Sequence, residues 1–386
     1  MGPVVTGTSE WEAVRTRIAA LGREPDATDI ADALRWCGHV VSDAHVLAVG
    51  EALRRDSVGA GPLDPLLGLP GVTDVIVNGP GEVYVDTGDG LRATSVHFSS
   101  DDEVRRLAVR LAASVGRRLD DASPFVDARM VDGTRVHAIL GTLVDVGTCV
   151  SLRVPVRTRL TLDDWVASGT CHPTVAEVLG RLVSARTAFL VSGGTGSGKT
   201  TLLASLLGLV PAHERILVVE DSRELNPDHP HCVRLEARVA NAEGAGAVTL
   251  TQLVRQALRM RPDRLVVGEV RGAELVDLLI ALNTGHEGGC GTVHANAAAT
   301  VPARLEALAA LGGLGREAAH SQIAAAISVV VHVSRETGRR RVAEVAVLVR
   351  GADGLVVTEA ALEVTPDGRL VRHRGLGLLE RFGVVP

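Results

Sequence analysis

The sequence predicts an α/β protein in which a small N-terminal α+β domain precedes a larger domain built on a mainly parallel sheet. From Thr187 onward, uninterrupted apolar runs alternate with helical patterns, which is typical of parallel strands covered by helices on both faces. Between Gly61 and Pro155, short strand patterns flank a single helix. The chain has 386 residues, 46% hydrophobic and 22% charged, so it is long enough for two or three domains and too apolar to be disordered.

Residues 1–56 predict a helical segment of two or three short helices. Its apolar residues recur at helical spacing: Trp11, Val14, Ile18, Ile30, Leu34, Val46, Val49 and Leu53. The first residues include two glutamates and have no basic start followed by an apolar core, so we expect no signal peptide. Because no run of about 18 apolar residues occurs anywhere in the chain, we also expect no transmembrane segment.

Residues 57–155 predict the α+β domain. Strands are expected near 74–77 and 82–85, and two more in DGTRVHAIL and TCVSLRVPV. Between these pairs, SSDDEVRRLAVRLAASVGR has a serine N-cap, acids in its first turn and arginine at its end, which indicates a helix. The polar stretch 156–170 is expected to be a linker.

Residues 171–386 predict the larger domain. It begins with the helix TVAEVLGRLVSA, and strands and helices then alternate: AFLVSG, a helix from Thr200, RILVVED, TLTQLVRQALRM, RLVVGEV, GAELVDLLIALN, GCGTVHA and ATVPARLEALAAL. After Ile327 the pattern shortens into hairpins.

Composition excludes several classes of protein. The formal net charge is −6 and only 2% of residues are aromatic, which argues against a nucleic-acid binder. The five cysteines are scattered without a CxxC pair, so neither a disulfide framework nor a four-cysteine zinc site is indicated. These observations favour a cytoplasmic protein.

The strongest signal is GGTGSGKT, which fits the pattern G-x-x-x-x-G-K-[ST] between an apolar strand and a helix. In that setting backbone N–H groups and a helix N-terminus bind the phosphates of ATP. Lys199 is the only lysine among 40 basic residues, as expected where arginine cannot replace a compact ammonium group. Thr200 is the expected Mg²⁺ ligand. The expected nucleotide-binding residues are Gly193, Gly194, Thr195, Gly196, Ser197, Gly198, Lys199, Thr200 and Thr201.

Acidic residues follow two further apolar strands. Glu220, Asp221 and Glu224 lie at the end of the strand in RILVVEDSREL, where they either serve a bound Mg²⁺ and an attacking water or cap a helix. The strand RLVVGE ends at Gly268 and Glu269, whereas the usual motif ends in aspartate. Glu269 is expected to hold Mg²⁺, directly or through water, or to act as a base, or else to pair with Arg271.

The glycine-rich stretch GHEGGCGTVHAN contains His286, Cys290 and His294 at steps of four. That spacing would suggest zinc on a continuous helix, but the intervening glycines make such a helix improbable. A neutral histidine that donates a hydrogen bond to the γ-phosphate is the favoured alternative, and an ordinary loop histidine is the third.

Taken together, GGTGSGKT, VVEDSREL, RPDRLVVGEVRGAE and NTGHEGGCGTVHAN resemble the four boxes of the ATPase superfamily that drives type II and type IV secretion and pilus assembly. GPLDPLL and VTDVIVNGPGEVYVD look closest to its Tad/CpaF branch. The resemblance implies a RecA-like ATPase domain, a homohexameric ring, and ATP bound between the two domains.

The resemblance also implies roles for individual residues. Glu224 would be the general base and Glu269 the Walker B acid, supported by Glu220 and Asp221. Two arginines of the N-terminal domain, Arg135 and Arg153, would reach the nucleotide, although Arg153 also fits an ordinary strand-edge arginine. His294 would contribute to catalysis, and His286 to nucleotide binding.

The function that the resemblance implies is Mg²⁺-dependent ATP hydrolysis that powers assembly of a Tad/Flp-like pilus or export of a pilin-like substrate. The partner would be a polytopic inner-membrane platform protein, at the cytoplasmic face of the membrane. Two alternatives remain: the ATPase of a conjugation or type IV secretion channel, and a nucleotide-switched scaffold with little turnover.

Overall fold

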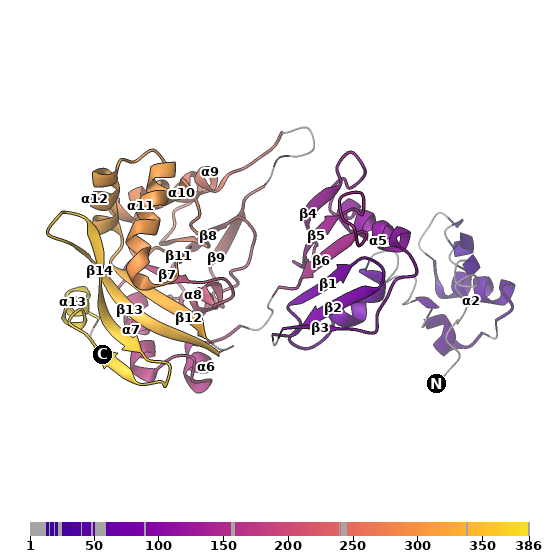
Figure 1. Ribbon diagram of the computed structural model, residues 1–386, viewed down its shortest axis with the longest axis horizontal. Coiled ribbons are helices and arrows are strands. Elements are labelled where there is room, and N and C mark those ends of the chain that lie inside the picture. Colours follow the sequence, from indigo (N-terminus) through magenta and orange to yellow (C-terminus); the bar gives the residue numbers. More distant parts are fainter. Residues whose placement is uncertain are drawn as a thin grey trace. The chain divides into compact units, whose positions relative to one another are not determined.

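The computed structural model divides into two compact units, Met1–Val156 and Arg157–Pro386, which run from indigo to magenta and from magenta to yellow in Figure 1. The residues that the structure describes are 13–14, 16–18, 20–21, 25–39, 41–47, 49–50, 59–88, 90–155, 159–238, 240, 245–336 and 339–384. Each unit has its own hydrophobic core.

The first unit contains helix α2 (Ala27–Trp36) near its start. Asp26 caps it, and Asp29 bonds back to the Asp26 backbone, so two N–H groups of the helix start are satisfied reciprocally. Ile30 and Leu34 of α2 are buried in a small apolar cluster with Val14, Ile18, Val46 and Val49. Most of the residues expected at helical spacing in this segment are thus brought together.

A six-stranded antiparallel sheet forms the rest of the first unit, in the order β3-β2-β1-β6-β5-β4. Its strands are β1 (Asp74–Asn78), β2 (Glu82–Asp86), β3 (Leu91–Ala93), β4 (Phe125–Arg129), β5 (Arg135–Ile139) and β6 (Cys149–Arg153). Helix α5 (Asp101–Ala113) packs Val104, Leu107 and Leu111 on one face of this sheet. The short helices η1 (Gly61–Leu63) and α4 (Asp64–Leu67) precede β1.

The second unit contains a nine-stranded sheet in the order β15-β14-β13-β12-β7-β11-β10-β8-β9. The six strands from β12 to β9 in this order are parallel, and the strands β12 to β15 form antiparallel hairpins. The bounds are β7 (Phe189–Gly193), β8 (Ile216–Glu220), β9 (Cys232–Glu236), β10 (Arg264–Val267), β11 (Cys290–His294), β12 (Val329–Glu336), β13 (Arg339–Arg350), β14 (Val356–Val364) and β15 (Leu370–Arg372). The mainly parallel RecA-like sheet expected from the sequence is confirmed.

Helices cover both faces of this sheet (Figure 1). One core cluster joins the sheet to α6 (Leu162–Ala167), α7 (Pro173–Ser184) and α8 (Lys199–Leu207). The other joins it to α9 (Leu250–Leu258), α10 (Glu274–Asn283), α11 (Val301–Leu311) and α12 (Arg316–Ala326). Short helices η2 (Ala298–Thr300), α13 (Leu376–Leu379) and η3 (Glu380–Phe382) complete the unit.

The stretch 156–170, for which we expect a linker, contains α6. Thr161 caps this helix, and Trp165 is 3% exposed, with its indole Nε1 donating to Ser205 Oγ at 3.0 Å. The polar residues that suggested a linker are the first turn of a helix, and a buried tryptophan fixes that helix to the second core.

The order of the strands positions the candidate site. In a parallel sheet all carboxyl ends lie at one edge, and ligands bind outside that edge. The phosphate loop follows β7, His294 ends β11, Glu269 follows β10 and Glu220 ends β8. These residues lie far apart in the sequence, but their four strands are neighbours in the sheet.

Candidate active site

The phosphate loop connects β7 directly to α8. Gly198 has φ +101° at the N-cap of α8, a conformation that favours glycine. A Cβ atom on Gly193 would lie 2.3 Å from the Val333 carbonyl oxygen, so only glycine fits the close approach of β12. The loop therefore has the backbone geometry of an anion cradle at a helix N-terminus.

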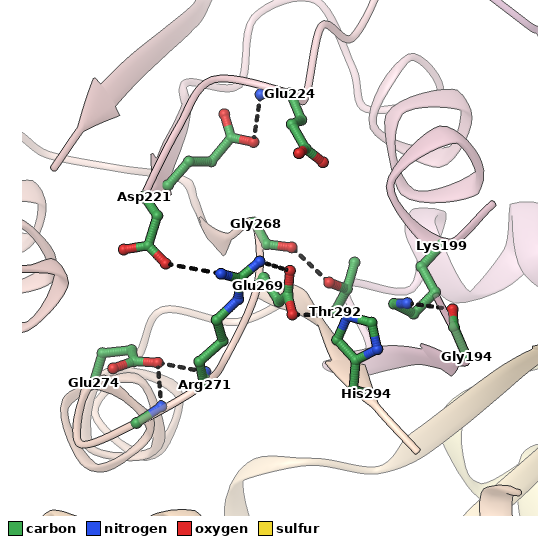
Figure 2. A network of polar contacts seen from close by, with 12 residues as sticks. Gly194, Lys199, Asp221, Glu224, Gly268, Glu269, Arg271, Glu274, Thr292 and His294 are labelled. Atoms are coloured by element: carbon green, nitrogen blue, oxygen red, sulfur yellow. Dashed lines mark hydrogen bonds and ion pairs between the residues drawn. The ribbon is translucent and has the colours of Figure 1, made fainter. Parts of the chain in front are cut away.

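Lys199 points back along this loop. Lys199 is 6% exposed, and its Nζ donates to the Gly194 carbonyl oxygen at 2.7 Å (Figure 2). Burial lowers the pKa of the ammonium group, while the nearby charges of Glu269 and Glu224 raise it in part. The only lysine of the chain thus lies between the phosphate loop and two of the expected catalytic acids.

Glu269 lies at the centre of a polar network (Figure 2). One carboxylate oxygen is 2.9 Å from Nε2 of His294, and the other accepts from Nη2 of Arg271 at 2.5 Å. Burial raises the pKa of Glu269, but the hydrogen bond and charge of Arg271, with His294 and Lys199, outweigh it and hold the pKa below its usual value. Glu269 both pairs with Arg271 and lies near Lys199. An ion pair with Arg271 therefore does not exclude a role for Glu269 beside the phosphate loop.

His294 lies at the end of β11 beside Glu269. Burial, and then the charge of Lys199, lower the pKa of His294 below the ordinary value of 6.5, while the charge of Glu269 raises it in part. A ligand phosphate near Nε2 of His294 would compete with Glu269 for a hydrogen bond from this nitrogen.

Arg271 connects the two acidic strand ends. Besides Glu269, its guanidinium group reaches Asp221 at 3.8 Å, and its backbone N–H donates to Glu274 at 2.6 Å. Sequence analysis considered Arg271 only as a competing partner of Glu269. Its link to Asp221, fifty positions away, has no local sequence signal.

Glu220 holds the turn that follows β8, which carries Asp221 and Glu224. It is 3% exposed, and its Oε1 accepts from the backbone N–H groups of Glu224 and Leu225 at 3.0 and 2.9 Å. Burial raises its pKa to about 7. Glu220 therefore caps a turn that carries Glu224, and it caps no helix, because β9 is the next element that the structure describes after β8.

Gly268 explains the unusual end of β10. A Cβ atom at this position would lie 2.4 Å from Cγ of Glu220 and 2.9 Å from its Oε1. The side chain of Glu220 occupies the space that any side chain at position 268 would need. Glycine at this position is thus fitted to the buried glutamate on the neighbouring strand.

His286 and Cys290 do not belong to this site. Cys290 begins β11 and His294 ends it, so the five-residue strand separates them, and His286 lies before its start. The structure therefore does not bring His286 together with His294 and Glu269, and its contribution to nucleotide binding stays a prediction. Among the residues that the structure describes, no cluster of three histidine, cysteine or acidic side chains can hold a metal ion, which leaves no support for zinc.

In the first unit, Arg135 and Arg153 are directly opposite each other on β5 and β6. Arg129 on β4 faces Arg135, and Asp74 on β1 faces Arg153, whose Nε donates to Asp74 at 3.1 Å. The four side chains form one row across adjacent strands of a single sheet face. Sequence reasoning found two of its arginines and missed Arg129, because only the strand register reveals it.

Three comparisons with known proteins place the chain in a family. The family described as "Type II/IV secretion system protein" matches residues 56–339. A Mycobacterium tuberculosis (strain H37Rv) protein provisionally named for conjugal transfer is 56% identical over 324 residues, 82% of this chain and 92% of that protein. Type IV secretion system protein VirB11 of Brucella suis is 31% identical over 301 residues, 70% of this chain and 83% of that protein.

The chain belongs to the type II/IV secretion ATPase superfamily, as its four boxes suggested. The crystal structure of the pilus retraction motor PilT with bound ADP has the same fold, with a TM-score of 0.51 and 19% identity over 81% of this chain and 83% of that one. Among the described residues, no helix combines the length and apolar character needed to cross a bilayer.

Proposed function

We propose that this protein is a Mg²⁺-dependent ATPase that supplies mechanical work to a secretion or pilus-assembly system. The observation that carries the proposal is the meeting of Lys199, Glu269 and His294 at one edge of the parallel sheet, beside the glycine loop. Phosphoryl transfer to water needs positioned charges more than covalent chemistry, and this edge holds cations and acids in the required arrangement.

The residues fit a nucleotide with Mg²⁺. Loop N–H groups and Lys199 would hold the phosphates, and oxygen donors of the kind that Mg²⁺ prefers come from the Thr200 hydroxyl and the Glu269 carboxylate. When bound, the ion would neutralise charge on the β- and γ-phosphates. Thr201, in the first turn of α8, would add a further donor to the phosphates.

Glu224 is the proposed general base. Its side chain is exposed, but its backbone is fixed by Glu220, and its carboxylate lies close enough to Lys199 to raise the pKa of that ammonium group. A general base must reach the attacking water, and its backbone must be held in place. The exposed carboxylate of Glu224 can meet the first requirement, and the buried carboxylate of Glu220 meets the second. Asp221 would contribute by holding Arg271.

The first unit is proposed to complete the site through Arg135 and Arg153. Guanidinium groups stabilise the charge that develops during phosphoryl transfer. The pairing of these arginines on adjacent strands means that they would act together, with Asp74 orienting Arg153. A homohexamer docked on a membrane platform protein, on the cytoplasmic side, is the proposed assembly.

Two biological settings remain as proposals. The pilus branch is supported by the strings quoted from the sequence. A conjugation or type IV secretion channel is supported by the names of the two relatives at 56% and 31% identity. Both settings use the same chemistry at this site, so the choice concerns the partner and not the mechanism.

The test is steady-state ATP hydrolysis by the full-length protein and its Glu269→Gln variant, with particle mass determined by light scattering in ATP and Mg²⁺. We expect turnover to fall at least about 100-fold in the variant, because one carboxylate that organises His294 and Mg²⁺ is lost. Equal turnover in both proteins would refute the assigned role of Glu269. ATP binding without turnover in the wild-type protein would favour the nucleotide-switched scaffold.

A further inference from the structure

The β12–β13 hairpin brings two more arginines to the phosphate loop. Nη1 of Arg335 lies 3.5 Å from the position that a Cβ on Gly196 would occupy, and Cδ of Arg340 lies 3.5 Å from the corresponding position on Gly198. The strand register pairs Arg335 directly with Arg340. The two side chains therefore share one face of the hairpin, and this face meets the loop.

The core packing identifies the same face independently. Val333 and Val342, each two residues from one of these arginines along its strand, are buried in the cluster that contains Leu202 and Leu203 of α8. Because alternate residues of a strand point to opposite faces, Arg335 and Arg340 project on the side of α8.

The opposite face of the hairpin carries different contacts. Arg341 donates to Glu336 there at 2.8 Å, and Arg339 also projects on that side. Arg335 and Arg340 are exposed, and in the described part of the chain neither side chain makes a hydrogen bond or an ion pair. The guanidinium group of Arg335 and the side-chain stem of Arg340 thus lie against a loop built to hold an anion, and neither has an acidic partner among the described residues.

The order of the strands places the acidic residues and the two arginines on opposite sides of the phosphate loop. In the sheet, β7 lies between β12 and β11, and the strands that carry Glu269 and Glu220 are on the β11 side. The acids that suit a metal ion and a water therefore approach the loop from one flank, whereas Arg335 and Arg340 approach it from the other.

We infer that Arg335 and Arg340 are ligands of the diphosphate portion of the nucleotide, which they bind on the flank away from the acids. This inference rests on the nucleotide site proposed above and extends it to residues outside the four sequence boxes. Arginine suits this role because its planar fork donates two parallel hydrogen bonds to phosphate oxygens.

The test is calorimetric titration of ADP with Mg²⁺ into the full-length protein and its Arg335→Gln, Arg340→Gln and double variants. We expect about a 10-fold weaker Kd for Arg335→Gln and a larger loss in the double variant, because each change removes a charge-assisted contact. Arg339→Gln is the matched control, since it makes the same charge change on the other face of the hairpin, and its Kd should stay within about twofold of the wild type.

Two further measurements exclude a purely structural effect. The thermal midpoints of the variants should match that of the wild-type protein, and Arg335→Lys, which keeps the charge without the fork, should lose less affinity than Arg335→Gln. ADP binding by Arg335→Gln and the double variant equal to that of Arg339→Gln would overturn the inference and leave the nucleotide site intact. Failure of the wild-type protein to bind ADP, or full binding by Lys199→Ala, would overturn the nucleotide site itself.

Discussion

Gly268→Ala tests whether Glu220 and Gly268 are fitted to each other. The new Cβ would lie 2.4 Å from Cγ of Glu220, and ordinary contact begins near 3.4 Å, so the glutamate must move by about an ångström. That movement weakens the hydrogen bonds from the backbone N–H groups of Glu224 and Leu225. Overpacking and two weakened hydrogen bonds together should cost about 3 kcal/mol of the free energy of unfolding.

A double-mutant cycle isolates this contact. In a Glu220→Ala background the obstructing side chain is absent, and Gly268→Ala should then cost less than about 1 kcal/mol, which gives a coupling of about 2 kcal/mol. Urea unfolding, followed by circular dichroism, measures both differences. Gly180→Ala is the control: no atom lies within 4 Å of its added Cβ outside its own helix, and the change should be neutral or stabilising.

The result that would refute this reasoning is an equal cost of Gly268→Ala in the two backgrounds. The same experiment has a kinetic readout, because a displaced Glu220 releases the turn that carries Glu224. We expect the ATP turnover of Gly268→Ala to fall at least about 10-fold at a temperature where the protein remains folded.

Three further changes test other parts of the site. The pKa of Glu220 in the folded state, about 7, is above its ordinary value of 4.5, so the folded state binds more protons between these values. The free energy of unfolding should therefore fall by about 3 kcal/mol as the pH rises from 4.5 to 7. Glu220→Gln should remove this pH dependence in urea unfolding, and an unchanged pH dependence would contradict the assignment. Lys199→Arg keeps the charge but replaces a buried, compact ammonium group with a larger planar guanidinium group, so turnover should fall at least about 100-fold with an unchanged circular dichroism spectrum. Full activity would reject the phosphate-loop assignment. Glu214→Ala leaves Arg264, which is 2% exposed and 2.6 Å from Glu214, buried without its acidic partner; we expect a loss of about 3–5 kcal/mol in the same unfolding assay, and a loss below about 1 kcal/mol would show that the pair is dispensable.

The parallel sheet was predictable because mainly apolar strand patterns, such as ILVVE of β8 and FLVSG of β7, alternate with helical patterns. Acids in the first turn and arginine at the end also predicted α5. Sequence reasoning failed at α6, because six residues are too few to show a period and Asp163 and Asp164 suggested an exposed linker.

The sequence predicted that Glu269 follows a strand and that Lys199 begins a helix after the glycine loop, because motif and element pattern coincide there. It did not show that a whole strand lies between His286 and His294, since a step of eight residues carries no such information. Arg271 with Asp221, and Arg335 with Arg340, depend on which strands are neighbours in the sheet. The order of strands is set by packing across the whole domain, and no local pattern encodes it.

The single lysine allows one defined position of the protein to be labelled with amine-reactive reagents. Its only side-chain amine is buried in the loop between β7 and α8, where burial lowers the pKa and so leaves more of the amine in its reactive, unprotonated form. Reagents that attach to amines therefore have no surface side chain to modify. Any such label on a side chain would report on access to one position alone, the position where the phosphates are proposed to bind.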